Sequence, residues 1–116
     1  LARSRGLGDV YKRQAQKVSK LRIFNDKQNK MNLSLGDISG SVLVISQFTL
    51  CADTRKGRRP SFVNAESPEL SKKLYNKFIS CLADKGLEVQ SGEFGSNMDV
   101  KLVNNGPVTF VLDSEE

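Results

Sequence analysis

The sequence predicts an α+β fold with a mixed sheet, and three observations lead to this prediction. The chain has 116 residues, a length that suits one compact domain. One amphipathic segment predicts a long helix. Short apolar runs bounded by turn signals lie on both sides of it, and a shorter helical pattern precedes them. The predicted order is therefore helix, strands, long helix, strands.

Residues 1–14 differ in composition from the rest of the chain. They hold four basic residues and one acidic residue, a net charge of +3. The whole chain has 18 basic and 13 acidic residues, so the other 102 residues hold 14 and 12 and carry only +2. The opening segment also lacks periodicity and has two early glycines. We therefore expect it to be a foreign, adaptor-like lead that is not part of the domain.

A helix end, a hairpin and a turn are predicted next. The apolar positions of residues 15–24 have helical spacing and predict the last turns of a helix whose beginning is missing. Residues 21–25 and 31–35 flank the polar stretch 26–30, which predicts a hairpin. Residues 36–40 predict a second turn.

The following segment predicts a strand and then a loop. Residues 42–45 are all β-branched or aliphatic, which predicts a strand that is buried on both faces and ends in residues 46–50. Residues 53–62 are polar and contain Gly57 and Pro60, so they predict a loop. This loop holds most of the local positive charge.

The long helix is the clearest element. Ser67 suits the N-cap, Pro68 suits the first helical position, and Gly86 ends the pattern. The apolar residues between them form one stripe: Leu70, Leu74, Phe78, Cys81 and Leu82.

Three strands are predicted after this helix. Residues 87–90 are strand-like, and residues 98–103 and 108–112 alternate between apolar and polar. The segment 104–107 (NNGP) separates the last two, and an Asn-Gly hairpin turn is its simplest interpretation. About 5–6% of X-Pro peptide bonds are cis, so the residues alone leave a cis bond before Pro107 open.

The absence of histidine excludes several kinds of site. It removes Ser-His-Asp triads, Cys-His pairs and most zinc and non-haem iron sites, and we expect no metal and no cofactor. Cys51 and Cys81 lack the spacing of a metal or redox pair and are expected to be core residues, with a disulfide as the alternative. No apolar run approaches the ~20 residues that span a bilayer, so we expect a cytoplasmic protein that does not bind membranes.

Four motifs occur in order along the chain: residues 46–50 (SQFTL), 57–62 (GRRPSF), 92–98 (GEFGSNM) and 104–109 (NNGPVT). Each motif alone is a weak signal. In their order and spacing over residues 15–113 they resemble the D-aminoacyl-tRNA deacylase family, also called D-Tyr-tRNA deacylases.

The resemblance implies a fold and an activity. Family members have a mixed, largely antiparallel curved sheet and are homodimers with the pocket at the subunit interface. They hydrolyse the ester between a D-amino acid, or glycine, and the terminal ribose of tRNA, which is a chiral proofreading step in translation. Members begin with a strand and hairpin that would precede Ala15. We therefore expect residues 15–116 to be a single deacylase-like domain that lacks both.

The resemblance also implies which residues select the substrate. In the family the bond corresponding to Gly106–Pro107 is cis and reaches into the partner's pocket. Rigid carbonyls there can accept hydrogen bonds from the substrate ammonium and leave no room for an L side chain. Asn104 belongs to the same motif, and Met98 and Phe94 are expected to wall the adenosine pocket. Core packing is the alternative for Met98 and Phe94.

Thr49 is the obvious side-chain nucleophile, but a hydroxyl without a base is a poor one. We therefore prefer substrate-assisted hydrolysis, in which the vicinal ribose hydroxyl helps to activate water or stabilise the tetrahedral intermediate. Gln47 and Thr49 would position the ester and the terminal adenosine, with support from Ser46. The backbone N–H near Phe94 would contact the oxyanion or the ribose. Ordinary strand-end hydrogen bonding is the alternative for Ser46 and Thr49.

Four cations lie within five residues of the loop: Arg55, Lys56, Arg58 and Arg59. They suit contacts with acceptor-stem phosphates of tRNA, and a solvated basic loop is the alternative. The rival interpretations of the whole chain are a tRNA-binding module and a dimerisation fragment, both without catalysis.

Overall fold

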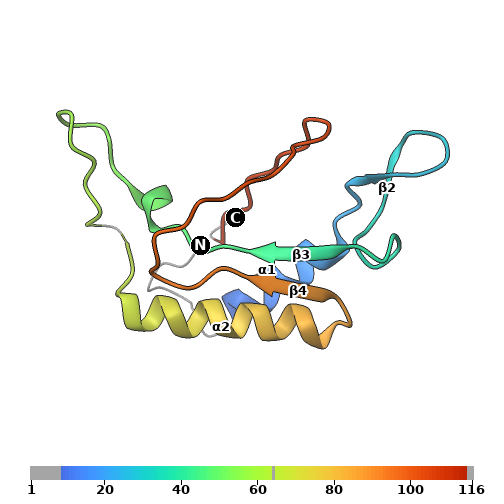
Figure 1. The fold of residues 1–116 in the computed structure, drawn as a ribbon, viewed down its shortest axis with the longest axis horizontal. Helices are drawn as coiled ribbons and strands as arrows, with labels where there is room; N and C mark the ends of the chain where they lie inside the picture. Colours follow the sequence, from blue (N-terminus) through green and yellow to red (C-terminus); the bar gives the residue numbers. More distant parts are fainter. Residues whose placement is uncertain (1–8, 64, 115–116) are drawn as a thin grey trace.

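Two helices, a short 3₁₀ helix and two small sheets form the fold in the computed structural model, which describes residues 9–63 and 65–114 (Figure 1). In chain order the elements are α1 (Val10–Lys20), β1 (Phe24–Asn25), β2 (Met31–Leu33), β3 (Ser41–Val44), the 3₁₀ helix η1 (Phe48–Cys51), α2 (Pro68–Asp84) and β4 (Glu88–Ser91). β1 and β2 pair antiparallel, and β3 and β4 pair parallel. The predicted α+β class is confirmed, with two separate two-stranded sheets among the described residues in place of one curved sheet.

Helix α1 begins at Val10, before the predicted start at Ala15, and crosses the predicted boundary after Gln14. Val10 is 4% exposed and Gln14 is 8% exposed, so the first half of the helix packs against the rest of the molecule. The helix ends because Leu21 has an extended backbone, with φ −57° and ψ 131°. Residues 1–8 lie outside the described residues, and the foreign origin of residues 1–14 stays a prediction.

The predicted hairpin is confirmed as β1 and β2. Its turn is held by Asp26, whose Oδ1 accepts hydrogen bonds from the backbone N–H groups of Gln28 (2.8 Å) and Lys30 (3.0 Å). These bonds favour the ionised carboxylate, and the bond from Lys30 is the largest cause of a lowered pKa of Asp26. The second predicted turn is closed by a hydrogen bond of 2.9 Å from the Gly40 N–H to the Leu35 carbonyl.

Helix α2 forms where the sequence predicts it. The Ser67 hydroxyl accepts a hydrogen bond from the Leu70 N–H at 3.4 Å and so satisfies one of the unpaired donors of the first turn. The helix begins at Pro68, which suits this position because its missing N–H would have no partner there. It ends at Asp84, just before Gly86 turns the chain in the left-handed region (φ 81°).

The core lies between the two helices and one face of the β3–β4 sheet. Its buried centre consists of Ala15, Phe78 and Leu82, which are at most 8% exposed. Half-buried residues from α1, α2, the strands and the α2–β4 turn pack around this centre: Tyr11, Val18, Val42, Val44, Cys81, Leu87 and Val89. The predicted packing of Cys81 is confirmed, and Cys51 and Cys81 are both free thiols, so the disulfide alternative is wrong.

The prediction that the strand after residue 41 is buried on both faces is wrong. Successive side chains of a strand point to opposite faces. Val42 and Val44 pack against the core, whereas Leu43 is 59% exposed. The continuous apolar run does not distinguish a strand covered on both faces from one covered on a single face, because covering depends on elements distant in sequence.

The two strands predicted within residues 98–103 and 108–112 are also wrong for the described chain. Both segments lack a backbone ladder there, because no neighbouring strand pairs with them. Their apolar side chains are largely uncovered, with Leu102 73%, Val103 91% and Val111 88% exposed. Alternation of apolar residues therefore predicts extended backbone correctly but not the partner that would make it a strand.

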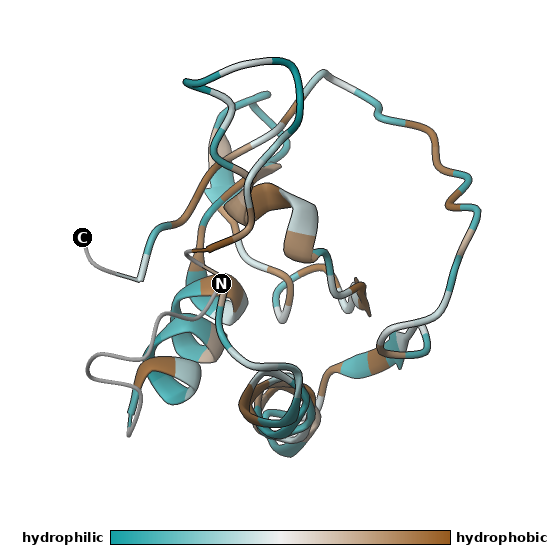
Figure 2. Ribbon diagram, turned by 90° about the vertical axis from the view of Figure 1, so that its left-hand side faces the viewer, coloured by the Kyte–Doolittle hydropathy of each residue, from teal (hydrophilic) through white to brown (hydrophobic). Residues whose placement is uncertain are grey.

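Three extended segments project away from α2: the β1–β2 hairpin, the loop that follows η1, and residues 98–112 (Figure 1). They raise the radius of gyration to 15.6 Å, against about 13 Å for a compact chain of this length. Figure 2 shows apolar stretches along these extended parts of the chain, and Leu50 and Val63 are each 82% exposed.

Candidate functional site

The carboxyl ends of the two parallel strands bring two of the predicted motifs together. Val44 at the end of β3 lies opposite Ser91 at the end of β4. The Gly92 N–H then donates to the Val44 carbonyl at 3.0 Å, which extends the contact beyond the sheet. Residues 46–50 and residues 92–98 therefore leave the sheet at the same edge. The carboxyl edge of parallel strands is a common place for ligands to bind.

Gln47 and Thr49 are joined by a side-chain hydrogen bond from Nε2 of Gln47 to Oγ1 of Thr49. Both residues are exposed, and Ser46 is half-buried. Thr49 lies in η1, so the prediction that a buried strand continues to this residue is wrong. The chain bends after Gln47, and the Ala52 N–H closes the short helix onto the Thr49 carbonyl at 3.1 Å. Because the Thr49 oxygen accepts a bond, its own proton remains available to a ligand at this edge.

Phe94 and Met98 are held by contacts within the chain. The ring of Phe94 packs on the ring of Tyr75 in α2, with 5.6 Å between the ring centroids. A Cβ atom at Gly92 would lie 2.6 Å from the sulfur of Met98, so the Met98 side chain packs directly against the backbone of Gly92 and would have to shift to admit a larger residue. Phe94 and Met98 are both half-buried. Their role in walling an adenosine pocket stays a prediction.

Gly106 and Pro107 lie at the end of an exposed arm, and the peptide bond between them is cis. Gly106 has φ 149°, and a Cβ atom there would lie 2.6 Å from the backbone nitrogen of Val108, so only glycine fits. Asn104 holds the bend, because its Oδ1 accepts from the Val108 N–H at 3.4 Å and its Nδ2 donates to Thr109 Oγ1 at 3.2 Å. The structure therefore gives Asn104 a role in shaping the arm.

The arm and the carboxyl edge remain separate within one chain. Figure 1 shows the red arm and the green segment that contains η1 as distinct projections. In the described residues no hydrogen bond or ring contact joins Gly106 or Pro107 to Gln47, Thr49 or Phe94. The structure thus places the starts of motifs 46–50 and 92–98 at one edge of the sheet, whereas motif 104–109 lies apart from them.

Residues 8–113 match the family model described as D-Tyr-tRNA(Tyr) deacylase. The chain belongs to this family. The match includes both motifs at the carboxyl edge, the basic loop and the exposed arm. The resemblance inferred from the four motifs is confirmed.

Relatives of this deacylase-family chain support the assignment. The D-aminoacyl-tRNA deacylase of Bifidobacterium animalis subsp. lactis (strain AD011) is 56% identical over 102 residues, which are 88% of this chain and 64% of the relative. The chain thus spans less than two thirds of that relative's length. A Bacillus subtilis (strain 168) protein named inactive D-aminoacyl-tRNA deacylase is 54% identical over 101 residues, or 87% of this chain and 76% of the relative.

A solved structure has the same fold as this family member. The protein named c-Myc DNA Unwinding Element Binding Protein matches with a TM-score of 0.79 and 34% sequence identity. The match covers 89% of this chain and 70% of that one. The predicted deacylase-like fold is confirmed by this comparison.

The basic loop of this deacylase-family chain is closed at its base by paired backbone hydrogen bonds between Asp53 and Ser61, of 2.7 and 2.9 Å. Arg55 forms a two-point ion pair with Asp53, with contacts of 2.8 and 3.0 Å. These side-chain bonds are the largest cause of the lowered pKa of Asp53. The remaining cations of the loop form no ion pair within the described residues: Lys56, Arg58 and Arg59.

Tyr75, which is not among the residues predicted from the sequence, connects α2 to the carboxyl edge. Its hydroxyl lies 2.8 Å from the carbonyl oxygen of Val44 and 3.1 Å from that of Gly92. The helical spacing of the sequence indicates that Tyr75 is buried, because it adjoins Leu74 and lies three residues before Phe78 on the buried side of the helix. A tyrosine on such a stripe carries a hydroxyl that needs a partner when it is buried.

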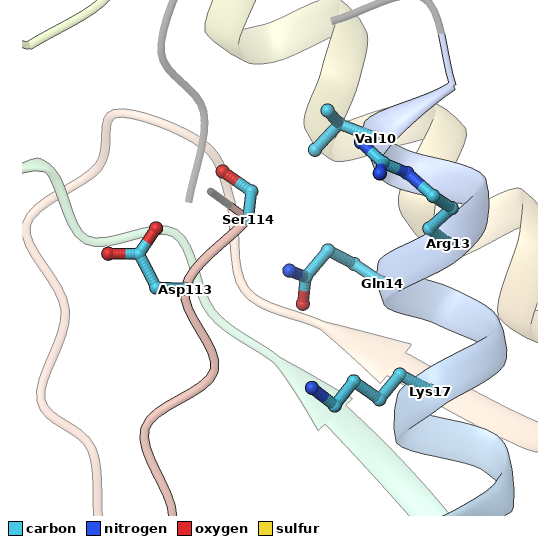
Figure 3. Close-up of a pocket in the computed structure, with 6 residues that line it drawn as sticks. All are labelled: Val10, Arg13, Gln14, Lys17, Asp113 and Ser114. Atoms are coloured by element: carbon cyan, nitrogen blue, oxygen red, sulfur yellow. The ribbon is translucent and has the colours of Figure 1, made fainter. Parts of the chain in front are cut away.

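A cavity of about 220 Å³ lies elsewhere, between α1 and the end of the described chain (Figure 3). Its lining consists of Val10, Arg13, Gln14, Lys17, Asp113 and Ser114. It contains none of the predicted site residues, so the cavity and the carboxyl edge are separate features.

The described residues lack two further features. They contain no group of three or more histidine, cysteine, aspartate or glutamate residues that is arranged to hold a metal ion. None of their helices is both long enough and apolar enough to cross a membrane.

Proposed function

We propose that this chain hydrolyses D-aminoacyl-tRNA to the free D-amino acid and tRNA, and so acts in chiral proofreading. The observation that carries the proposal is the match of residues 8–113 to the D-Tyr-tRNA(Tyr) deacylase family. The meeting of two family motifs at the carboxyl edge of β3 and β4 supports it. Glycyl-tRNA is proposed as a further substrate, because glycine lacks the side chain that a chirality filter rejects.

The proposed reaction is assisted by the substrate. Water adds to the ester carbonyl carbon to give a tetrahedral oxyanion, and the ribose oxygen then leaves with a proton. The vicinal ribose hydroxyl helps to activate the water or to stabilise the oxyanion, which suits a chain without histidine. Thr49, held by Gln47, donates toward the substrate, with support from Ser46. The backbone N–H near Phe94 supplies a second donor.

The proposed pocket is completed by a second copy of the chain. Gly106 and Pro107 are exposed at the end of an arm that is separate from Gln47 and Thr49, and an arm of this kind suits a contact with a homodimer partner (Figure 1). In the partner's pocket the arm's carbonyls accept hydrogen bonds from the substrate ammonium. The same rigid backbone excludes an L side chain by steric clash. In this proposal Asn104 holds the shape of the arm, and Met98 helps to wall the adenosine pocket.

The basic loop is proposed to contact phosphates of the tRNA acceptor stem. Lys56, Arg58 and Arg59 are exposed and carry charge that no acidic side chain of the described residues neutralises. Arg55 contributes less, because Asp53 already pairs with it. An enzyme that acts on tRNA would work in the cytoplasm.

The test is the hydrolysis of D-Tyr-tRNA and L-Tyr-tRNA by the 116-residue chain under identical conditions. We expect the D ester to be cleaved roughly 100-fold faster than the L ester after subtraction of the spontaneous rate. A rate for D-Tyr-tRNA equal to the spontaneous rate would overturn the proposal.

A tRNA-binding or dimerisation fragment without catalysis is the second candidate. It is favoured by the Bacillus subtilis relative, which is 54% identical and is named inactive. Binding of uncharged tRNA without turnover of the D ester would support the tRNA-binding form. A stable dimer with neither property would support the dimerisation form.

A further inference from the structure

The hydroxyl of Tyr75 occupies a junction between three elements. Tyr75 belongs to α2 and is only 9% exposed. Its oxygen lies 2.8 Å from the Val44 carbonyl oxygen and 3.1 Å from the Gly92 carbonyl oxygen. The Val44 carbonyl also accepts from the Gly92 N–H at 3.0 Å. One side chain from the helix therefore joins the ends of β3 and β4 through their backbone.

The two backbone positions that Tyr75 holds are the starting points of the candidate site. Gln47 follows Val44 by three residues, and Phe94 follows Gly92 by two. The Tyr75 ring adds a direct contact with the ring of Phe94, at 5.6 Å between centroids and 41° between planes. The hydroxyl thus contacts the backbone from which both segments leave the sheet, and the ring packs against one of these segments.

A buried hydroxyl is a demanding group to place at such a junction. Its burial is favourable only if it keeps a hydrogen-bond partner, and a phenylalanine would fill the same space without this requirement. The hydroxyl has a single proton, so it donates to one of the two carbonyls at a time. Either bond keeps α2 attached to the carboxyl edge.

We propose that Tyr75 is a positioning residue for the deacylase reaction: its hydroxyl holds the carboxyl ends of β3 and β4 together, so that the Gln47–Thr49 pair and the backbone near Phe94 face the same ester. This inference rests on the proposed function, because it assigns a role in that reaction. Tyr75 does not touch the substrate. It acts through the backbone of the two segments that do.

The experiment compares Tyr75→Phe with Tyr11→Phe in the 116-residue chain. Both substitutions remove one phenolic hydroxyl, and the Tyr11 hydroxyl makes no hydrogen bond within the described residues. We expect Tyr75→Phe to lower kcat for D-Tyr-tRNA by roughly tenfold with KM within about twofold, because binding relies on remote phosphate contacts. Tyr11→Phe should leave both constants unchanged. Circular dichroism confirms that each variant is folded.

A second measurement keeps the inference testable if the unaltered chain cleaves no D-Tyr-tRNA. Hydrogen exchange of the backbone amides should become faster in Tyr75→Phe in residues 44–49 and 92–98, and should stay unchanged in the β1–β2 hairpin. If the unaltered chain shows no turnover but the exchange pattern is observed, the proposed function is overturned. The conclusion that Tyr75 holds the ends of β3 and β4 together then stands. Unchanged exchange in both segments, or unchanged kcat in an active chain, would overturn the role of Tyr75.

Discussion

The hydroxyl oxygen of Thr49 accepts a hydrogen bond from the side-chain amide of Gln47, two residues earlier in the chain. This bond spans the bend at which extended backbone gives way to η1. Both side chains are exposed at the carboxyl edge of the parallel strands. The amide fixes the orientation of the hydroxyl, which suits a group that positions a substrate by donating a hydrogen bond.

Thr49→Ala is expected to lower kcat for D-Tyr-tRNA by about 10- to 100-fold without abolishing turnover, because the residue positions the ester and does not attack it. Thr49→Ser keeps the hydroxyl and should stay within about threefold of the unaltered chain. Single-turnover kinetics measure both effects. A covalent aminoacyl adduct on Thr49, or complete loss of turnover in the alanine variant, would contradict a positioning role.

Gly106→Ala is expected to lower turnover of the D ester and to reduce the preference for D over L. The reason is that φ is 149° and a Cβ atom would lie 2.6 Å from the backbone nitrogen of Val108, so the arm must change shape. Gly86→Ala is the matched control, since Gly86 also has positive φ (81°) but has open space around it. The ratio of D to L hydrolysis should change only in Gly106→Ala. An equal change in both variants would show a general loss of stability.

Replacing Arg58 and Arg59 together with alanine is expected to weaken tRNA binding and its dependence on salt. Each lost phosphate contact reduces the slope of log K against log salt by about 0.9. The matched control replaces Lys72 and Lys73 of α2, which removes the same charge from a different exposed surface. Filter binding of tRNA at several salt concentrations measures the slopes. Equal slopes in the two double variants would reject a specific role for the loop.

Asp26→Asn is expected to destabilise the chain at neutral pH and to have a smaller effect in acid. The folded pKa of Asp26 is lowered by its bonds from the N–H groups of Lys30 and Gln28. Its contribution is therefore present above the unfolded pKa of about 3.9 and is lost as the pH falls through the lower folded value. Urea unfolding between pH 7 and pH 3 measures the difference between the two chains.

The control for this pH dependence is Asp99→Asn, at an exposed aspartate for which the described residues provide no hydrogen bond. Its unfolding midpoint should follow that of the unaltered chain at every pH. If the difference between the unaltered chain and Asp26→Asn were constant across the range, the carboxylate charge would have no part in holding the turn.

The elements that the sequence determined by itself depend on interactions between near neighbours. Helix α2 follows from the Ser67 cap, Pro68 and the turn at Gly86, all of which act within a few residues. The β1–β2 hairpin is likewise predicted from a polar turn between short apolar runs. The family assignment also followed from the sequence, because four short motifs in fixed order identify a family without any knowledge of how they meet in space.

The tertiary structure alone decided which surfaces are covered and which distant residues meet. Leu43 is exposed, and residues 98–112 form no ladder with any other part of the described chain, because covering and pairing need elements that are far away in sequence. The same holds for Tyr75, which reaches Val44 across 31 positions of the chain. Local patterns identify the groups that can form hydrogen bonds, and only the folded chain brings each donor to its acceptor.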